Sequence, residues 1–385
     1  MRVLFVNPYY KPYLGGIERI IERVSAELRS NGAEAVGVLT TRVHFPDRVM
    51  SDLPDHEVMD GVEVFRATFR PATLPRVFHA ALAGYLSLDI PQVLRTFKPD
   101  VIHFTYSEWW AANLNTYLFS LRTPHVLSTF FHAWPRRKTT MPLYAANRWL
   151  VRRMEAVVVS SEFEGRQVRL AYGAPAARIL VIPPGVDAPT SIPERSGRDS
   201  VTVLAVGRLS RNKGQLLLVQ MIHQLSLERP ELKVRLWLAG GDAGDGQAIA
   251  QYVSQHRLEP MVQVLGYCAD SQLADLYRQA DIFALPSQVE SFGIVFIEAM
   301  AYGLPVVAYG VGPVRSILSQ GALLAPVGDE RAFLDALRCL VHDPARRCQL
   351  GRDGRAMVMS RYTWRATGEQ FYNLYRRLAE DRPSH

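Results

Sequence analysis

The sequence has few cysteines and no long apolar run. The three cysteines, Cys268, Cys339 and Cys348, lack metal-ligand spacing and cannot all pair with one another, so we expect reduced thiols and no metal site. No apolar run reaches the roughly 18 residues that span a bilayer. The first residues, Met-Arg-Val-Leu-Phe-Val, lack the apolar stretch and cleavage site of a signal peptide, so they predict a buried strand and a cytoplasmic protein.

Signatures of several other protein classes are also absent. The sequence has no low-complexity tract, no Gly-x-Gly-x-x-Gly spacing of a dinucleotide fold, and no helix-turn-helix, zinc-finger or RNA-binding signature. We therefore expect neither a cofactor nor a nucleic-acid partner. The 385 residues are 48% hydrophobic and 21% charged, which is the profile of a globular enzyme with two domains.

Short apolar runs alternate with longer amphipathic segments, which predicts two α/β domains, each with a parallel sheet wrapped by helices. We place the first domain at 1–188 and the second at 201–360, with a linker at 189–200, where prolines and mixed charges interrupt the periodicity. The last segment, 361–385, has apolar residues at helical spacing and predicts an amphipathic helix that packs on a folded domain. The expected strands are Val3–Val6, Ala35–Leu39, Val62–Phe65, Val101–Phe104, His125–Thr129, Ala156–Val159, Ile179–Ile182, Val201–Val206, Val234–Ala239, Val262–Leu265, Ile282–Leu285 and Pro305–Ala308.

The net charge of +7 is unevenly distributed, because the segment 122–154 holds basic residues, aromatic residues and no acidic residue. This pattern favours peripheral docking on an anionic membrane. A nucleic acid is the rival partner, and a solvated basic face over core aromatics is the structural alternative. The basic residues are Arg122, Arg136, Arg137, Lys138, Arg148, Arg152 and Arg153.

Two carboxylates, Glu290 and Glu298, flank a Phe-Gly turn that opens a predicted helix. The first amides of that helix, from Gly293 onward, form a seat for phosphate because they lack intrahelical partners and lie at the positive end of the helix dipole. Glu290 is placed to accept hydrogen bonds from sugar hydroxyls, and Glu298 to bind a ribose diol. In the structural alternative, Glu298 belongs to an ordinary polar helix face and Glu290 is a solvated loop charge.

Two further loops follow predicted strands and contain glycines. Gly15 and Gly16 come after the first strand, where they would let the backbone approach a substrate. The turn from Gly207 to Gly214 contains Arg208 and Lys213, two cations able to clamp a diphosphate. Either loop could also be an ordinary turn between a strand and a helix.

Taken together, these motifs resemble the retaining GT-B glycosyltransferases of family 4. The match runs almost from end to end and is strongest between Val201 and Ala308. The motifs that carry it are Gly15-Gly-Ile-Glu18, Ser160-Ser-Glu162, Pro184-Gly-Val-Asp187, Val206-Gly-Arg-Leu-Ser-Arg-Asn-Lys-Gly214, Pro286-Ser287, Glu290-Ser-Phe-Gly293 and Glu298-Ala-Met-Ala-Tyr-Gly-Leu-Pro-Val-Val307. The resemblance implies two Rossmann-like domains with the active site in the cleft, and a final helix that returns to the N-terminal domain.

The resemblance also implies a role for each matching residue. Arg208 and Lys213 would bind the donor diphosphate and neutralise the leaving nucleotide without a metal. Glu298 would hold the ribose, and Glu290 the hydroxyls of the donor sugar near C3. His132 takes the place of the family's active-site histidine, which contacts the donor sugar at the reacting face. The other implied donor-binding residues are Gly15, Gly16, Ser291, Phe292, Gly293 and Ile294.

The implied function is transfer of a hexose, of the mannose or glucose type, from GDP-mannose or a UDP-hexose to a lipid-linked or cell-surface glycan. The alternatives are a GT-B-fold epimerase and a non-catalytic nucleotide-sugar-binding protein. Two features depart from the family pattern: Arg315 stands where many relatives have a glutamate, and the glycine-rich turn Gly240-Gly-Asp-Ala-Gly-Asp245 is longer than the simplest family form. Two other histidines, His103 and His125, are expected to be core or surface residues without a role in catalysis.

Overall fold

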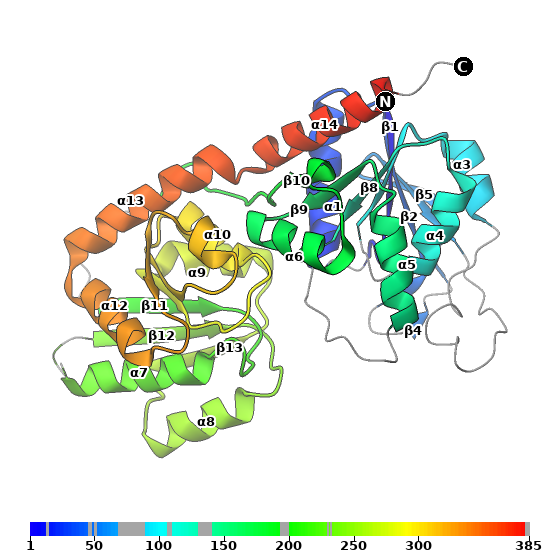
Figure 1. Ribbon diagram of the computed structural model, residues 1–385. Coiled ribbons are helices and arrows are strands. Elements are labelled where there is room, and N and C mark those ends of the chain that lie inside the picture. Colours follow the sequence, from blue (N-terminus) through cyan, green and yellow to red (C-terminus); the bar gives the residue numbers. More distant parts are fainter. Residues whose placement is uncertain are drawn as a thin grey trace. The chain divides into compact units, whose positions relative to one another are not determined.

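The computed structural model has two compact units, each built around an α/β sheet (Figure 1). The first unit comprises Met1–Pro184 with Trp364–His385, and the second comprises Gly185–Thr363. Two predicted features, His132 and most of the linker, lie outside the described residues. The structure describes residues 1–12, 15–44, 48–49, 52–67, 89–105, 110–129, 141–192, 200–228, 231 and 233–381.

Within the described residues, the sheet of the first unit has eight strands in the order β10-β9-β8-β7-β1-β2-β6-β5. Neighbouring strands are parallel except β5 and β6, which form an antiparallel hairpin at one edge. The central strands are continuous buried runs, as expected for a parallel sheet with helices on both faces. The strands are β1 (Arg2–Val6), β2 (Ala35–Thr40), β5 (His56–Met59), β6 (Val62–Arg66), β7 (Val101–Phe104), β8 (His125–Ser128), β9 (Ala156–Val159) and β10 (Ile179–Val181), and a separate ribbon joins β3 (Val43–His44) to β4 (Arg48–Val49).

Helices cover both faces of this sheet. The helices α1 (Gly16–Ser30) and α14 (Trp364–Glu380) pack on one face, around a core that includes Phe5, Ile21 and Phe371. Figure 1 shows α14, in red, beside α1, in blue. The other face is covered by α3 (Ile90–Phe97), α4 (Trp110–Phe119), α5 (Met141–Val151) and α6 (Glu162–Tyr172), and a short 3-10 turn, η2 (Ala176–Arg178), precedes β10.

A buried histidine links α14 to the sheet. In the His103 ring, Nδ1 lies 2.5 Å from the hydroxyl of Tyr375 on α14, and Nε2 lies 2.8 Å from the hydroxyl of Ser128 on β8. Burial lowers the pKa of His103 from 6.5 to about 3, so the ring is neutral in the folded protein. His103 is 2% exposed and His125 is 1% exposed, which confirms that both are core residues.

The His103 pKa predicts a loss of stability in mild acid. Below pH 6.5 the unfolded chain binds a proton at this residue, while the folded protein stays neutral until about pH 3. As the pH is lowered from about 8 to about 5, this residue alone should therefore decrease the free energy of unfolding by about 2 kcal/mol. Urea unfolding at the two pH values, followed by a signal from the first unit, measures the effect. His103→Gln should show a smaller pH dependence than the wild type, and an equal dependence would contradict the assignment.

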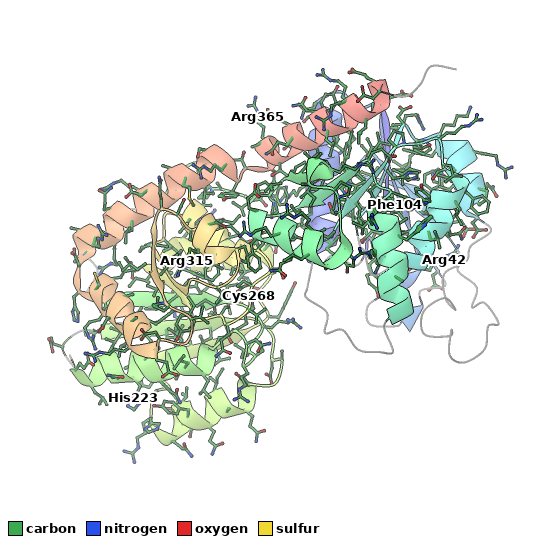
Figure 2. The ribbon with its side chains drawn as sticks, in the orientation of Figure 1. Arg42, Phe104, His223, Cys268, Arg315 and Arg365 are labelled. Carbon is green, nitrogen blue, oxygen red and sulfur yellow. The ribbon has the colours of Figure 1, made fainter. Side chains whose placement is uncertain are left out.

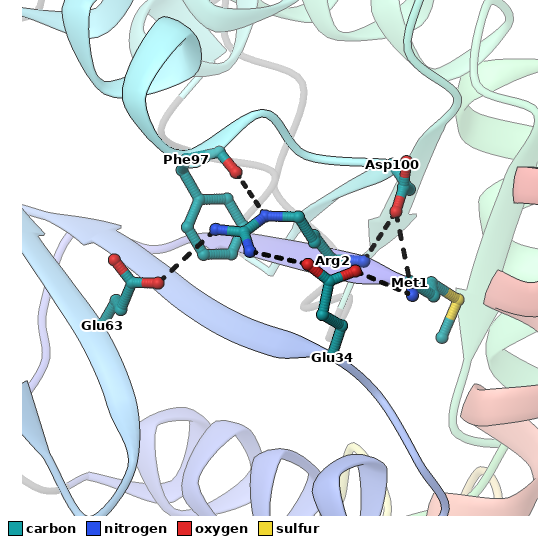
Figure 3. A network of polar contacts seen from close by, with 6 residues as sticks. All are labelled: Met1, Arg2, Glu34, Glu63, Phe97 and Asp100. Atoms are coloured by element: carbon teal, nitrogen blue, oxygen red, sulfur yellow. Dashed lines mark hydrogen bonds and ion pairs between the residues drawn. The ribbon is translucent and has the colours of Figure 1, made fainter.

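The N-terminus is fixed by a network of charged groups at the start of β1 (Figure 3). The Asp100 carboxylate accepts a hydrogen bond of 2.7 Å from the backbone amide of Arg2 and lies 4.0 Å from the Met1 ammonium. The Arg2 guanidinium donates to the carbonyl oxygen of Phe97 at 2.6 Å and to Glu34 at 3.1 Å. Asp100 lies at the amino edge of the sheet, where the strands begin, and its carboxylate is bound within this network.

The second unit contains a six-stranded parallel sheet in the order β13-β12-β11-β14-β15-β16 within the described residues. Its core fills both faces of this sheet, beneath the surrounding helices. The strands are β11 (Ser200–Val206), β12 (Lys233–Ala239), β13 (Val262–Gly266), β14 (Ile282–Leu285), β15 (Val306–Tyr309) and β16 (Ala322–Ala325). The helices are α7 (Gln215–Glu228), α8 (Gly246–Gln255), α9 (Asp270–Gln279), α10 (Ile294–Ala301), α11 (Val314–Ile317), α12 (Glu330–His342) and α13 (Pro344–Arg361).

The predicted fold class is confirmed, with two Rossmann-like α/β units and a final helix that packs on α1. Each predicted strand has a counterpart in the sheets, with small differences at the ends. The sequence prediction did not identify β5 or β16. No helix among the described residues combines the length and the apolar character that crossing a membrane requires.

Candidate active site

The polar motifs of the second unit lie at the carboxyl edge of its sheet. Because the strands are parallel, the loops that follow β11, β12 and β14 all emerge at this edge. Backbone hydrogen bonds join the loops directly: the amide of Gly207 donates to Ala239 at 2.8 Å, and the amide of Gln288 donates to Asn212 at 2.8 Å. Sequence segments about eighty residues apart therefore form one polar surface.

The turn that carries Arg208 is held by a buried glutamine. The Gln215 side chain donates to the carbonyl oxygens of Gly207 and Arg208 at 3.1 and 3.0 Å, and it accepts from the amide of Ser210 at 3.3 Å. Gln215 is 1% exposed, whereas Arg208 is exposed and makes no hydrogen bond or ion pair through its guanidinium with any described residue. Gln215 thus fixes the backbone while leaving the Arg208 charge available to a ligand.

A glycine directly after the neighbouring strand, β12, lets the two loops approach each other. A side chain at Gly240 would put its Cβ 2.1 Å from the carbonyl oxygen of Gly207, and the φ of Gly240 is +147°. The close contact continues where the amide of Leu209 donates to Gly241 at 2.9 Å. Close packing against the Arg208 turn therefore requires a glycine at position 240.

The structure brings Lys213 and Glu290 together. The Lys213 ammonium lies 2.7 Å from a carboxylate oxygen of Glu290, and their side chains are 26% and 7% exposed. Glu290 is thus a nearly buried, paired carboxylate, and the alternative of a solvated loop charge is wrong. The two charges are shielded from water and stabilise each other. A ligand that separates them must therefore supply a new polar partner to each side chain.

The turn before α10 has the predicted geometry. Gly293 has a φ of +88° and precedes the first helical residue, Ile294. Phe292, on the other side of Gly293, is buried and packs edge-on against Tyr362 with ring centroids 6.0 Å apart. Ser291 is half-buried in the same turn. The helix start therefore lies at the carboxyl edge, beside the Lys213 and Glu290 pair.

A tyrosine that the sequence analysis missed holds Glu298. The hydroxyl of Tyr277, on α9, donates to a carboxylate oxygen of Glu298 at 3.0 Å. Burial, together with the charge of Glu298, raises the pKa of Tyr277 well above 10.0, so the hydroxyl keeps its proton. The Tyr277 ring also stacks on Tyr302 with centroids 5.4 Å apart. Tyr277 is a positioning residue, and no motif around it marked it in the sequence.

The paired glycines of the first unit lie at the carboxyl edge of that unit's own sheet. The Glu18 carboxylate accepts from the amide of Gly15 at 2.9 Å and from the Asn7 side chain at 3.0 Å. Burial raises the pKa of Glu18, although the hydrogen bonds from Asn7 and Gly15 oppose this effect. A Cβ at Gly16 would meet no atom of the described residues within 4 Å. The loop is therefore fixed by Glu18 and has free space beside Gly16.

Two features singled out in the sequence remain: Arg315 and the possible metal ligands. Arg315, on α11, is exposed, and its guanidinium lies beside Gly310, where a Cβ would come within 3.4 Å of the arginine Nε (Figure 2). It makes no ion pair or hydrogen bond with the described residues, so its positive charge is open to solvent. Within the described part of the chain, no group of three or more His, Cys, Asp or Glu side chains could hold a metal ion.

The chain matches known proteins over most of its length. Residues 191–357 match the model of the glycosyl transferases group 1, and residues 15–185 match the glycosyl transferase 4-like domain. A D-inositol 3-phosphate glycosyltransferase from Kineococcus radiotolerans is 31% identical over 411 residues, which cover 96% of this chain and 92% of that protein.

Two solved structures share the fold. Sucrose-phosphate synthase from Thermosynechococcus elongatus has a TM-score of 0.76 at 22% identity, covering 98% of both chains. HepE from Anabaena, solved in complex with UDP and glucose, has a TM-score of 0.73 at 20% identity, covering 98% of this chain and 100% of that chain.

Two Rossmann-like units and a terminal helix that returns to the first unit define a GT-B protein. The chain belongs to the group 1 glycosyltransferases, family 4, and it is an enzyme that transfers a sugar from a nucleotide sugar. The resemblance seen in the sequence is confirmed.

Proposed function

We propose that this enzyme transfers a hexose from a nucleotide diphosphate sugar to an acceptor hydroxyl, with retention at the anomeric carbon. The observation that carries the proposal is the Lys213 and Glu290 pair before the start of α10, with the exposed Arg208 in the same turn as Lys213. The two cations and the helix amides suit a diphosphate, and Glu290 suits the hydroxyls of the attached sugar. Glu298, held by Tyr277, suits the ribose.

The chemical problem is the charge of the leaving group. As the glycosidic bond breaks, the sugar ring gains oxocarbenium character and the β-phosphate gains negative charge, which Arg208, Lys213 and the helix amides would stabilise. Retention requires attack from the face of the leaving group, and we propose that the departing phosphate accepts the proton of the acceptor hydroxyl. A sugar found covalently attached to Glu290 in a trapped reaction would exclude this route.

The roles of the remaining predicted residues stay proposals. Ser291, Phe292, Gly293 and Ile294 would contact the sugar and phosphate, and the Gly16 loop of the first unit would approach the diphosphate. His132, outside the described residues, would contact the donor sugar. We propose that no metal is required, because the cations supply the positive charge.

The first unit is proposed to bind the acceptor, a lipid-linked or cell-surface glycan at the cytoplasmic side of a membrane. The basic and aromatic composition of the segment 122–154 supports this choice. Two other functions use the same donor site: a GT-B-fold epimerase would need no acceptor, and a non-catalytic binding protein would form no product. Product analysis with and without acceptor separates all three.

Nucleotide binding tests the donor site directly. We expect either GDP or UDP to bind in the presence of a chelator, and Glu298→Gln to weaken that binding about tenfold because a neutral amide accepts more weakly than a carboxylate. Titration calorimetry measures both affinities and chooses between the guanosine and uridine donors. Glu259→Gln, a change at an exposed glutamate of the same unit, should bind as the wild type does. Failure of both nucleotides to bind would reject the donor site.

A further inference from the structure

A large groove lies at the amino edge of the first unit's sheet, at the opposite ends of the strands from Gly15 and Gly16. Its volume is about 1110 Å³. Its walls come from the segments that precede β7, β8, β9 and β10, from α3, and from the end of α14. The proposed donor and acceptor chemistry makes no use of this groove, which we call the amino-edge groove.

Cations outnumber acidic residues in the lining of the groove, which contains Arg95, Lys98, Arg122 and Arg178 against Asp100, Glu155 and Asp381. Arg95, Lys98 and Arg122 line it, are exposed, and make no hydrogen bond or ion pair through their side chains with the residues that the structure describes. Of the acidic lining residues, Asp100 belongs to the N-terminal network (Figure 3) and Glu155 accepts from the backbone amide of His125 at 2.7 Å, whereas Asp381, just beyond α14, is exposed. The unpaired cations create a preference for an anionic surface.

Large apolar side chains project at one lip of this groove. Leu118, Phe119 and Leu121, at and just beyond the end of α4, are 55%, 56% and 65% exposed. Three such residues among four consecutive positions form an apolar patch rather than scattered surface residues. Phe119 and Leu121 line the groove together with Arg122, so the apolar lip and the cations share one surface.

An aromatic residue extends the lip onto the neighbouring helix. Trp149, on α5, is 39% exposed, and its ring contacts Tyr117 of α4 with centroids 5.8 Å apart. The Arg153 guanidinium lies over the same indole ring, 4.0 Å from its centroid. An amphipathic ring with a cation above it is typical of side chains at the interface between lipid and water.

We propose that the amino-edge groove and its lip dock the enzyme on an anionic lipid surface. Leu118, Phe119 and Leu121 would enter the boundary between head groups and acyl chains, and the cations around them would contact the head-group phosphates. A single-stranded nucleic acid would stack its bases on exposed rings, and the two leucines of the lip offer it no such ring. The docking surface does not depend on the donor site of the second unit.

This surface differs from the one that the sequence predicted. The segment 122–154 begins at the amino edge with Arg122 and follows β8 to Thr129 at the carboxyl edge. The helix α5 then returns the chain to the amino edge at Arg152. The residues 130–140, which contain Arg136, Arg137 and Lys138, lie outside the described residues. The docking surface thus combines only part of that segment with residues from α3 and α4.

Vesicle binding tests the proposal with purified full-length protein. We expect cosedimentation with phosphatidylglycerol-containing vesicles and little with phosphatidylcholine alone, and weaker binding at high salt. The double variant Phe119→Ser with Leu121→Ser should bind anionic vesicles at least about tenfold more weakly, because it removes the inserting groups. Lys98→Glu with Arg122→Glu should produce a loss of similar size.

Leu227→Ser is the matched control, since Leu227 is 69% exposed but belongs to the second unit, and it should bind as the wild type does. Equal wild-type binding to anionic and neutral vesicles, or unchanged binding by both double variants, would overturn the proposal. Competition by soluble polyglutamate as effective as by vesicles would also overturn it, and would assign the surface to an acidic macromolecule. Nucleotide affinity in the same samples reports on the donor site independently.

Discussion

Replacement of Arg208 by alanine is expected to slow sugar transfer about a hundredfold while leaving the free energy of unfolding nearly unchanged. The guanidinium is exposed and has no ion pair with the described residues, so its removal breaks no hydrogen bond or ion pair among them. Its proposed task is to stabilise charge on the departing phosphate, and losing one such interaction raises the barrier by about 3 kcal/mol. Steady-state kinetics with the donor selected by calorimetry, together with thermal unfolding, measure both quantities.

Arg211→Ala is the control for this prediction, because Arg211 is an exposed arginine in the same turn. It should keep nearly full activity. Lys213→Ala is less clean, since it also leaves the nearly buried Glu290 without its cation and should lower stability as well as activity. An Arg208→Ala enzyme with normal turnover would remove the arginine from the proposed mechanism.

Replacement of Gly293 by alanine should abolish most activity and destabilise the second unit by about 3 kcal/mol. Two costs add: a non-glycine residue is strained at a φ of +88°, and the new Cβ would lie 2.6 Å from the ring of Phe296. Relief of this contact must shift the turn between Glu290 and α10, which is where we propose that the donor binds. Urea unfolding and donor kinetics measure the two effects.

Gly328→Ala separates the two costs. Gly328 has a similar φ of +79°, but a Cβ there would meet no atom within 4 Å. This variant should therefore lose only the backbone part, about 1 kcal/mol, and should retain activity. If both variants lost the same stability, the contact with Phe296 would not be the cause.

The sequence predicted those features that depend on local pattern. Buried strands such as Ile282–Leu285 are continuous apolar runs, and the turn at Gly293 has a glycine where φ is positive. Both follow from the residues themselves, without knowledge of what packs against them. β5 escaped notice because it is a short edge strand, His-Glu-Val-Met, with a polar, half-exposed pattern.

Contacts between distant segments could not be predicted in the same way. Tyr277 and Glu298 lie on different helices, and only the packing of α9 near α10 brings the hydroxyl to the carboxylate. Gln215 was equally hidden, because a glutamine at a helix start is usually a surface residue. The sequence analysis also treated 122–154 as one basic surface. In the structure, residues of this segment that are close in sequence lie at opposite edges of a sheet.

The pairing of Lys213 with Glu290 has a consequence for turnover under the proposed function. A nucleotide diphosphate that has lost its sugar can bind the Lys213 ammonium only by separating it from Glu290. The Glu290 carboxylate, whose side chain is 7% exposed, would then have lost its cation. The intact donor avoids this penalty, because its phosphate satisfies the ammonium and its hydroxyls satisfy the carboxylate. The Glu290 carboxylate therefore competes with the spent nucleotide for Lys213, which favours product release over product inhibition. The ratio of the affinities for the intact and the spent donor, from the same titrations, measures this preference.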